Sequence, residues 1–306
     1  LTGLVLCHYG VQAIVQLQAH PHTIFQCHKR THIDIAAGDE VIFEPQHQTE
    51  IQEHPTEIQS HQTGTQSHQT GVIVATKPRK NALSRKTNYR HEAKILAANV
   101  DQAFIVFAPE PMPTPLFIDQ LLVGLGMLNI DTFLILNKAD LITKDIQFSD
   151  ALTQKEKYCS IGYTVFTTGN HEHDDLEKIK SMMQNKNNIL VGQSGVGKSS
   201  LLNRLIPQAQ AKTSELTQES RLGKHTTIHS MLYPLPSGGC MIDSPGVRQW
   251  QHENLEKENL VQYFPEIDKW QHECKFRNCS HQKEPQCKVK EKAEEGVIHP
   301  ERWKNF

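Results

Sequence analysis

The chain has 306 residues, of which 37% are hydrophobic and 22% charged, which is enough apolar material for two domains and a small module. Its formal net charge of −2 excludes a global basic field that would draw the protein onto nucleic acid, so any RNA contact must come from local patches. No run approaches the roughly 18 apolar residues that a membrane span needs, and the start LTGLVLCHYGVQ is too short and too mixed for a signal peptide.

The cysteines indicate a reducing compartment, and we therefore expect a cytoplasmic protein. Four of the seven are scattered along the chain, and three gather within residues 274–287. This distribution suits one metal site better than a framework of disulfides.

Residues 1–76 predict a small antiparallel barrel. Short segments of rough apolar and polar alternation, separated by turn signals, occupy 3–17, 22–30, 36–45 and 71–78. An OB-type barrel is our first expectation and an SH3-like barrel the second, because periodicity alone does not separate the two.

A Gln/His-rich insert at 47–71 interrupts this series and contains SHQTG twice. Such polar sequence cannot bury enough apolar area to offset the entropy of ordering, so we expect a loop between two barrel strands. The alternative is a metal-storing tract, since histidines recur at 47, 54, 61 and 68. That even spacing is more typical of a repeat expansion than of a ligand geometry.

Residues 77–94 form a basic strip with seven Lys or Arg against one acid. The strip is interpreted either as a solvated linker or as a surface that meets RNA phosphates.

From residue 95 to about 255 the pattern alternates between buried strands and amphipathic helices. This alternation predicts an α/β domain with a mostly parallel sheet and helices on both faces. The remaining residues, 256–306, hold the cysteine cluster and then a segment that reads as one or two short helices.

The stretch GQSGVGKSS (192–200) matches the phosphate-loop pattern G-x-x-x-x-G-K-[ST], with an apolar run before it and a helical pattern after it. Glycines let backbone amides approach phosphate oxygens at a helix N-terminus. Lys198 is predicted to reach the β- and γ-phosphates as a catalytic group, and the Ser199 hydroxyl to bind Mg²⁺. The predicted nucleotide contacts here are Gly192, Gln193, Ser194, Gly195, Val196, Gly197, Lys198, Ser199 and Ser200.

NKAD (137–140) follows an apolar strand and predicts a guanine-reading loop. The Asp140 carboxylate can accept from both the N1 and N2 protons of guanine, whereas adenine offers no such pair, so Asp140 selects GTP. Asn137 is expected to brace the loop, with Lys138 lying along the base and Ala139 between them. FTTGN (166–170) stands where a last base-contacting loop belongs, but it departs from the common S-A-K form and carries little weight.

The guanine-reading loop precedes the phosphate loop, the reverse of the order in ordinary GTPases. A sheet does not record which loops are covalent, so joined termini and a new opening leave such a site intact. We therefore predict a circularly permuted G domain.

IDSPG (242–246) ends a strand about forty residues after the phosphate loop. Asp243 is predicted to hold the Mg²⁺ shell and the Gly246 amide to meet the γ-phosphate. In the stretch between, Thr226 and Thr227 both qualify to bind Mg²⁺ and the γ-phosphate, and Thr227 is favoured.

Val247 stands where many GTPases carry a glutamine that orients the attacking water. His225 is the nearest candidate to replace it as a catalytic group, the alternative being an ordinary loop histidine. Slow intrinsic hydrolysis that needs a partner follows as a hypothesis.

CKFRNCSHQKEPQC (274–287) has the spacing C-x₄-C-x-H-x₅-C. Three thiolates and one imidazole fill a tetrahedral Zn²⁺ shell and leave no open position, which indicates a structural site. The predicted zinc ligands are Cys274, Cys279, His281 and Cys287, with His272 as a competing ligand. Cations that could face RNA surround them: Lys275, Arg277, Lys283, Lys288 and Lys290.

NKAD, GQSGVGKSS and DSPG in this order, between a barrel and a cysteine module, resemble the ribosome small subunit-dependent GTPase A family, also called RsgA, YjeQ or YloQ. AANVDQAFIVFAPEP, GKHTT, DSPGVRQW and NCSHQKEPQC are similar to that family too. The resemblance implies an OB-fold N-domain, a circularly permuted P-loop G domain and a zinc-binding C-terminal module. It further implies a cytoplasmic GTPase that uses GTP/GDP with Mg²⁺ and carries one structural Zn²⁺.

The partners implied by the resemblance are the 30S ribosomal subunit and 16S rRNA near the decoding region, with hydrolysis stimulated by the ribosome late in small-subunit maturation. We expect a monomer that has no membrane partner. The alternative function is a metal-handling GTPase that uses the His-rich tract. A plain RNA-binding module with a vestigial nucleotide site is disfavoured by intact Lys198, Ser199, Asp243 and Asp140.

Overall fold

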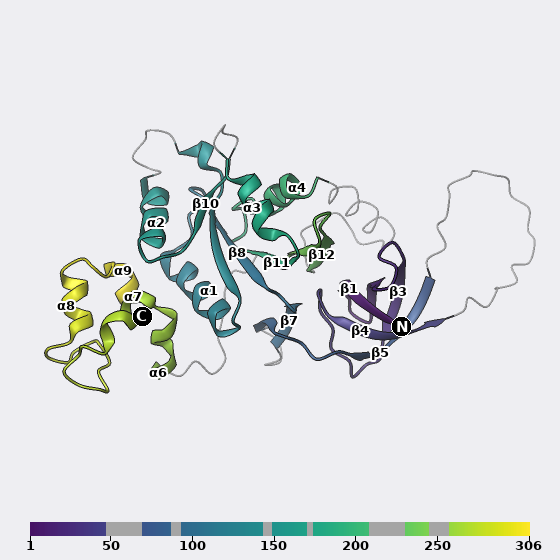
Figure 1. Cartoon of the computed structure of the whole chain (residues 1–306), viewed down its shortest axis with the longest axis horizontal. Helices are drawn as coiled ribbons and strands as arrows, with labels where there is room; N and C mark the ends of the chain where they lie inside the picture. The colour runs from purple at the N-terminus through teal and green to yellow at the C-terminus, as the bar shows by residue number, and fades with distance from the viewer. Residues whose placement is uncertain (47–68, 87–92, 143–148, 170–173, 208–229, 245–256) are drawn as a thin grey trace, which may run out of the picture.

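The computed structural model describes residues 1–46, 69–86, 93–142, 149–169, 174–207, 230–244 and 257–306. Along its long axis lie a barrel, an α/β domain and a helical module, in chain order (Figure 1). None of the helices within these ranges has the length and apolar character needed to cross a membrane.

The N-terminal unit is a closed barrel of five strands in the order β1-β2-β3-β5-β4. β4 returns antiparallel to β1, and β3 pairs with β5 in parallel. This order confirms the OB-type barrel. The strands are β1 (Thr2–Tyr9), β2 (Gln12–Leu17), β3 (Ile24–Lys29), β4 (Glu40–Gln46) and β5 (Gln69–Thr76).

Alternation in the sequence fills the barrel, because every second side chain points inward. Phe25 and Phe43 meet there edge to face at 4.8 Å between ring centroids, beside Val15 and Ile73. β5 begins at Gln69, so the last three residues of the predicted insert belong to a strand. The remainder of the insert, 47–68, lies outside the described residues.

A hairpin that the sequence analysis missed begins in the basic strip and extends beyond it, formed by β6 (Ala82–Lys86) and β7 (Ala93–Ala98). Before the hairpin, three of the strip's seven cations form ion pairs, two with residues of the barrel and one with a residue of the α/β domain. Lys77 pairs with Glu40 at 2.8 Å, Arg79 with the buried Asp39 at 2.7 Å, and Lys80 with Asp101 at 2.9 Å. Arg79 and Lys80 therefore connect the linker to the unit on either side of it, whereas Lys77 pairs within the barrel.

The α/β domain contains a six-stranded sheet in the order β10-β9-β8-β11-β13-β12, parallel except for β12. The chain enters at the centre, moves out to one edge, returns to the centre at β11 and then reaches the other edge. The strands are β8 (Gln102–Phe107), β9 (Asp131–Leu136), β10 (Val165–Thr167), β11 (Lys186–Val191), β12 (Met231–Pro234) and β13 (Gly239–Asp243).

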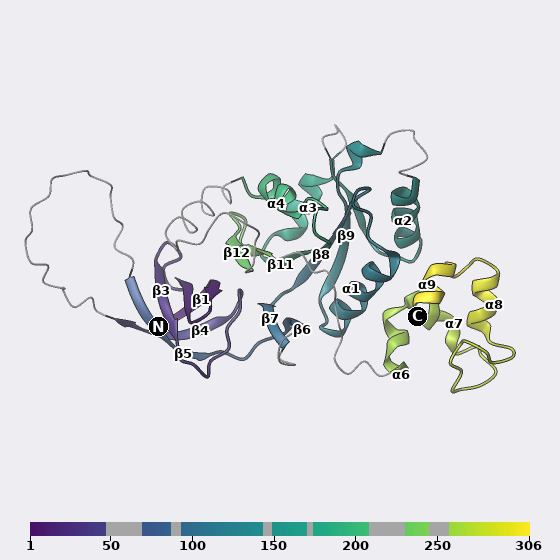
Figure 2. The same cartoon turned by 180° about the vertical axis from the view of Figure 1, so that it is seen from behind.

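Helices cover both faces of this sheet, as predicted (Figure 2). Ile105 and Phe107 of β8 pack on the side of α1 and α2, and Phe104 and Val106 on the side of α3 and α4. A strand buried on both faces reads as a continuous apolar run. The helices are α1 (Pro115–Met127), α2 (Ser149–Ser160), α3 (Leu176–Met183) and α4 (Lys198–Leu205), with a short helix η1 (Ala139–Leu141) after β9.

The C-terminal module has a small core of its own and rests on α1. A Cβ atom at Gly126 of α1 would lie 2.7 Å from the Tyr263 ring, so this contact requires glycine. The core is built from Phe264, Ile267, Val289, Ala293 and Ile298. The elements are α6 (Lys257–Leu260), η3 (Val261–Tyr263), α7 (Pro265–Gln271), α8 (Lys288–Glu294) and α9 (Pro300–Asn305).

A buried ionic cluster centred on Arg302 joins this module to the α/β domain. Arg302 of α9 is fully buried, and its guanidinium donates to Asp119 on α1 and to Glu266 on α7, each at 2.6 Å. Tyr158 and Asn305 donate to the same Asp119 carboxylate at 2.9 and 2.6 Å. The ion pair between Arg302 and Asp119 and three further partners, Glu266, Tyr158 and Asn305, thus compensate the desolvation of the two buried charges.

Candidate nucleotide and zinc sites

The loops that carry the nucleotide motifs meet at the carboxyl edge of the parallel sheet. β8 and β11 are neighbours at the centre, and the chain leaves them toward opposite edges. Such a switch point is where open α/β sheets bind ligands. The segments that follow β8, β9, β10, β11 and β13 all emerge here.

Asn137 links the two transposed motifs directly. Its amide nitrogen donates to the Val196 carbonyl at 2.9 Å, a residue 59 positions away in the phosphate loop. Its amide oxygen accepts from the Thr168 hydroxyl at 2.8 Å, and its side chain is buried. The NKAD loop and the phosphate loop, which are distant along the chain and in the reverse of the usual order, are therefore joined by hydrogen bonds in the folded protein.

Lys138 makes a second connection. Its ammonium donates to the Gly195 carbonyl at 2.7 Å and to the Glu110 carbonyl at 2.9 Å, so it joins the loops after β8, β9 and β11. The backbone at Lys138 is left-handed, with φ of +57°. This turn carries Ala139 and the exposed Asp140 over the same edge of the sheet.

The segment after β10 contributes more than its sequence indicated. The Thr168 carbonyl accepts from Ala139 N–H at 3.0 Å, and a Cβ atom at Gly169 would lie 3.0 Å from the Asp140 carboxylate. Thr168 and Gly169 therefore shape the guanine-reading loop. Only the position of Thr168 and Gly169 at the end of a predicted strand could have indicated this role, because their residue types do not match the common motif.

Two glycines of the phosphate loop are required by close contacts. Gly192 has φ of +151°, and a Cβ atom there would lie 2.3 Å from the Val106 carbonyl oxygen. Gly197 has φ of +89°, and its Cβ atom would lie 2.5 Å from the Asn137 amide nitrogen. The invariant positions of the motif thus coincide with positions where only glycine fits.

Lys198 begins α4 and lies folded back over its own loop. Its ammonium donates to the carbonyls of Gly192 and Gln193 at 2.8 and 2.9 Å. Burial lowers the pKa of Lys198, and the neighbouring Asp243 raises it. The other predicted contacts lie around it: Val196 is buried, and Ser194, Gly195, Ser199 and Ser200 are exposed.

Asp243 ends β13, in register with Leu190 on β11, and is almost fully buried. Burial raises the pKa of its carboxyl group to about 6, against the opposing effect of Lys198. A buried carboxylate whose charged form is disfavoured gains from a nearby cation, and oxygen ligands suit Mg²⁺. Asp243 and the Ser199 hydroxyl therefore fit a magnesium site. The other predicted groups, His225, Thr226, Thr227, Gly246 and Val247, lie outside the described residues.

Replacing Asp243 with asparagine is expected to stabilise the protein when nucleotide and Mg²⁺ are absent. The folded-state pKa lies above that of an unfolded aspartate, about 3.9, so the charged form favours unfolding. Its cost is small below pH 4, grows between about pH 4 and pH 6, and is fully present above pH 6. Asp243→Asn should therefore add about 1–3 kcal/mol at pH 8 and less at pH 5.

Thermal or urea unfolding at the two pH values measures this effect. Asp131→Asn, at the exposed start of β9, is the matched control and should change little at either pH. An Asp243→Asn protein that is less stable than the parent at pH 8 contradicts the assignment of a strained buried charge.

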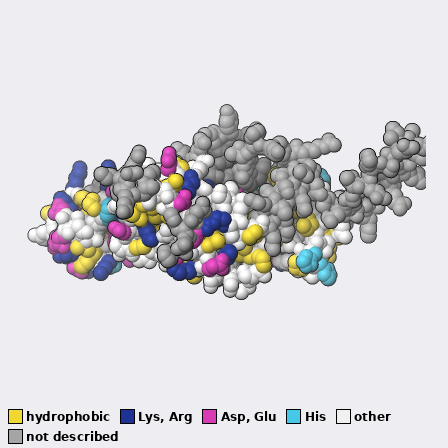
Figure 3. Space-filling view, turned by 90° about the horizontal axis from the view of Figure 1, so that it is seen from above, with side chains coloured by type: hydrophobic (Ala, Val, Ile, Leu, Met, Phe, Trp, Pro, Cys, Tyr) yellow, Lys and Arg dark blue, Asp and Glu magenta, His cyan; other side chains and the backbone are white. Residues whose placement is uncertain are grey.

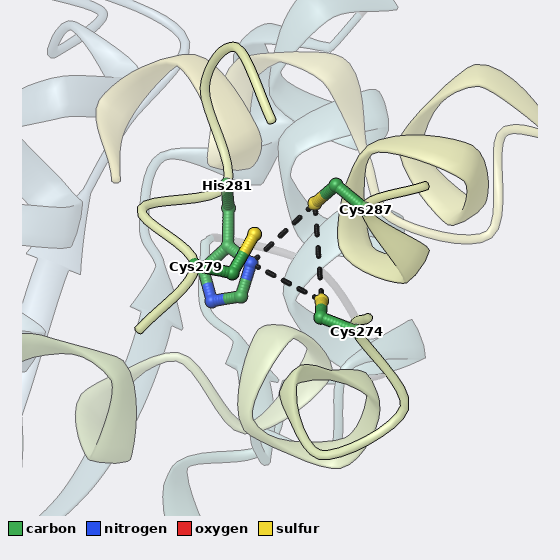
Figure 4. A group of neighbouring side chains, drawn as sticks. All are labelled: Cys274, Cys279, His281 and Cys287. Atoms are coloured by element: carbon green, nitrogen blue, oxygen red, sulfur yellow. Dashed lines mark hydrogen bonds between the residues drawn. The ribbon is translucent and has the colours of Figure 1, made fainter. Parts of the chain in front are cut away.

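The second site lies in the C-terminal module, where Cys274, Cys279, His281 and Cys287 converge (Figure 4). Their ligand atoms all lie within 4.8 Å of one another, and no other group of three or more potential ligands occurs in the part of the chain that the structure describes. His272, the competing ligand of the sequence analysis, is not a member of this group.

The spacing of these atoms fits a tetrahedral zinc ion. With Zn–S of about 2.3 Å and Zn–N of about 2.0 Å, sulfur pairs lie about 3.8 Å apart and sulfur–nitrogen pairs about 3.5 Å apart. The Cys274 and Cys287 sulfurs are 3.9 Å apart, and each lies 3.5 Å from Nδ1 of His281. A disulfide needs about 2.0 Å, so the residues present match a metal site.

Contacts around the cluster orient its ligands. The Trp303 indole donates to the His281 carbonyl at 3.3 Å, and Cys287 caps α8 by accepting from Lys290 N–H at 3.4 Å. Glu284 accepts from the Ser280 amide and hydroxyl at 2.9 and 2.6 Å, and these bonds lower the pKa of Glu284 to about 2. The loop is thus held in shape by groups other than its ligands.

Comparison with known proteins identifies the family. The model of the RsgA GTPase family matches residues 76–253. The chain is 36% identical over 305 residues to the small ribosomal subunit biogenesis GTPase RsgA of Actinobacillus succinogenes, covering 99% of this chain and 82% of that protein. The protein of the same name from Hahella chejuensis is 37% identical over 308 residues, with the same coverage of each chain.

Two solved structures are similar over nearly the whole chain. YloQ, described as a circularly permuted GTPase, superposes with a TM-score of 0.66 at 28% identity, covering 99% of this chain and 91% of YloQ. YjeQ from Thermotoga maritima gives 0.69 at 27% identity, covering 99% and 95%. The permuted order read from the motifs is confirmed, and the chain belongs to the RsgA GTPase family.

Proposed function

We propose that this protein is a GTP hydrolase that binds the 30S ribosomal subunit through 16S rRNA and converts GTP to GDP and phosphate late in small-subunit maturation. It acts as a monomer in the cytoplasm. The observation that supports this most directly is the Asn137 amide, which bonds the guanine-reading loop to the phosphate loop. The ribosomal partner is supported by the names of the relatives, which are small ribosomal subunit biogenesis GTPases.

Among the described residues, one group binds the guanine base and another binds the phosphates. Asp140 reads the guanine edge, and Asn137 and Lys138 hold that loop against the phosphate loop. The amides of 192–200 and the Lys198 ammonium hold the phosphates. When GTP binds, Lys198 exchanges its two carbonyl partners for phosphate oxygens, which a buried ammonium favours.

Mg²⁺ supplies charge neutralisation between the phosphates when bound, and Ser199, Asp243 and Thr227 are the residues that would hold it. His225 is the group we propose to position the attacking water, and the Gly246 amide is proposed to meet the γ-phosphate. A structural Zn²⁺ would be held by Cys274, Cys279, His281 and Cys287, where it would supply folding energy to a module with a small core.

The metal-handling alternative is not supported, because the relatives described above are named for ribosome biogenesis. The histidines at 47, 54, 61 and 68 lie outside the described residues.

Steady-state GTP hydrolysis with and without purified 30S subunits tests the proposal. We expect slow turnover by the protein alone and stimulation of at least about tenfold by 30S subunits, because Val247 cannot orient water. A Lys198→Ala variant should lose both activities. Rapid hydrolysis by the isolated chain, or turnover that 30S subunits leave unchanged, contradicts the proposal.

A further inference from the structure

The turn between Cys274 and Cys279 exposes an aromatic ring between two cations. Phe276 is 40% exposed, and Lys275 and Arg277 beside it are exposed as well. The Lys275 ammonium lies 5.6 Å from the centroid of the Phe276 ring. Cys279 N–H donates to the Phe276 carbonyl at 3.3 Å, so the ring stands on a closed turn that two metal-site thiols fix at its ends.

The lysines of α8 and the cations of the metal-site loop differ in their partners. On α8, Lys288, Lys290 and Lys292 pair with glutamates of the same helix or its C-terminal end, at 2.5, 3.9 and 2.5 Å. Among the described residues no carboxylate lies within ion-pair distance of the cations at 275, 277 and 283. Glu284 lies next to Lys283 in sequence, but its carboxylate accepts hydrogen bonds from Ser280 and from backbone amides of the loop.

The surface of the module therefore carries charges of both signs, as the left end of the molecule in Figure 3 shows. Lys275 and Arg277 flank Phe276 in sequence and have no carboxylate partner among the described residues, so both charges are available to an external anion. Glu273, exposed before Cys274, is the acidic side chain closest in sequence to Lys275 and Arg277.

We propose that Phe276 is a platform on which an unpaired RNA base stacks, while Lys275 and Arg277 bind the phosphates on either side. This assignment rests on the proposed ribosomal function and names the part of the RNA that the zinc module takes. Every base presents a π face, so the ring binds without regard to base identity. Bases inside a duplex are already stacked, so the platform selects single-stranded positions.

A protein partner fits this surface less well. An exposed ring that anchors a protein interface has apolar neighbours that exclude water, whereas Phe276 is followed by Arg277, Asn278 and Ser280 at the surface. The other large apolar side chain that the module exposes, Val297, follows the acidic Glu294 and Glu295. Val297 therefore serves as a matched control of similar exposure in an acidic setting.

The test uses the full chain and measures binding of a labelled single-stranded 12-nucleotide RNA and of the same sequence as a duplex. Phe276→Ala should weaken single-strand binding about 5- to 100-fold, in line with the loss of one stacked base, and change duplex binding less than about twofold. Phe276→Trp should restore single-strand binding. Arg277→Gln should weaken both and lower the salt dependence by about one phosphate contact.

Val297→Ala should leave both affinities unchanged. Zinc content and thermal unfolding of each variant confirm that the module is intact. Equal affinity of Phe276→Ala and the parent for single strands overturns the platform, as does an equal loss for single strand and duplex. The platform is also overturned if Phe276→Ala weakens binding to 30S subunits but leaves the affinity for single-stranded RNA unchanged, which would indicate a protein partner. Absent stimulation of the parent by 30S subunits defeats the proposed function instead, so the two failures are distinguishable.

Discussion

Replacing Arg302 with alanine is expected to lower the free energy of unfolding by about 3–5 kcal/mol, because it leaves the carboxylates of Asp119 and Glu266 buried without their cation. Asp119 keeps Tyr158 and Asn305 as donors, so part of the compensation remains. Since Arg302 joins α9 to α1 and α7, the module should detach from the α/β domain before the sheet unfolds. Urea unfolding followed by both tryptophan fluorescence and circular dichroism measures the two transitions.

Lys290→Ala is the control for this experiment. Its pair with Glu294 is exposed and 3.9 Å long, so its loss should cost less than about 0.5 kcal/mol. A second variant, Arg302→Met combined with Asp119→Leu and Glu266→Leu, removes the charges together and should recover much of the loss. If Arg302→Ala unfolds like the Lys290→Ala protein, the cluster does not join the two units.

Replacing Asp140 with asparagine is expected to reduce GTP affinity by about 100-fold or more, because two charge-assisted hydrogen bonds to guanine are lost and each contributes about 1.5–3 kcal/mol. An amide can instead donate to the C2 carbonyl of xanthine, so affinity for xanthosine triphosphate should rise. The fold should be unchanged, because the Asp140 side chain is exposed and the loop is held by Asn137 and Lys138. Displacement of a fluorescent nucleotide gives both affinities.

ATP should bind weakly to both proteins, and Asp131→Asn should bind GTP as the parent does. Retention of full GTP affinity by the Asp140→Asn protein would remove Asp140 from the base-reading role. It would also leave the bond between Asn137 and Val196 without a function in base selection.

Patterns that depend on neighbours in sequence were sufficient to predict the fold class. Alternation predicted the barrel, because a strand shows its buried face at every second residue. The continuous apolar run of β8 indicated a strand covered on both faces, and the helices on each side confirm it. The spacing of Cys274, Cys279, His281 and Cys287 predicted their convergence, because a four-ligand site imposes it.

Contacts between distant residues could not be predicted in the same way. Arg302 lies in the charged stretch HPERWKNF, which reads as a solvated helix, yet its partner Asp119 is 183 residues away and buries it. Lys77, Arg79 and Lys80 lie in a strip that the sequence left as either a solvated linker or a surface for RNA, and the structure pairs each with a carboxylate. Thr168 was undervalued because its role depends on the position of Asn137, which no local pattern contains.

The permuted order also has a consequence for how the chain is made. Translation delivers β8, β9 and β10 before β11, although β11 pairs with β8 at the middle of the sheet. The nascent half-sheet therefore presents β8, whose six residues are all buried in the finished protein, as an open edge. Unpaired apolar edges are sites of aggregation, so about eighty residues must emerge before this protein can close its own most vulnerable strand.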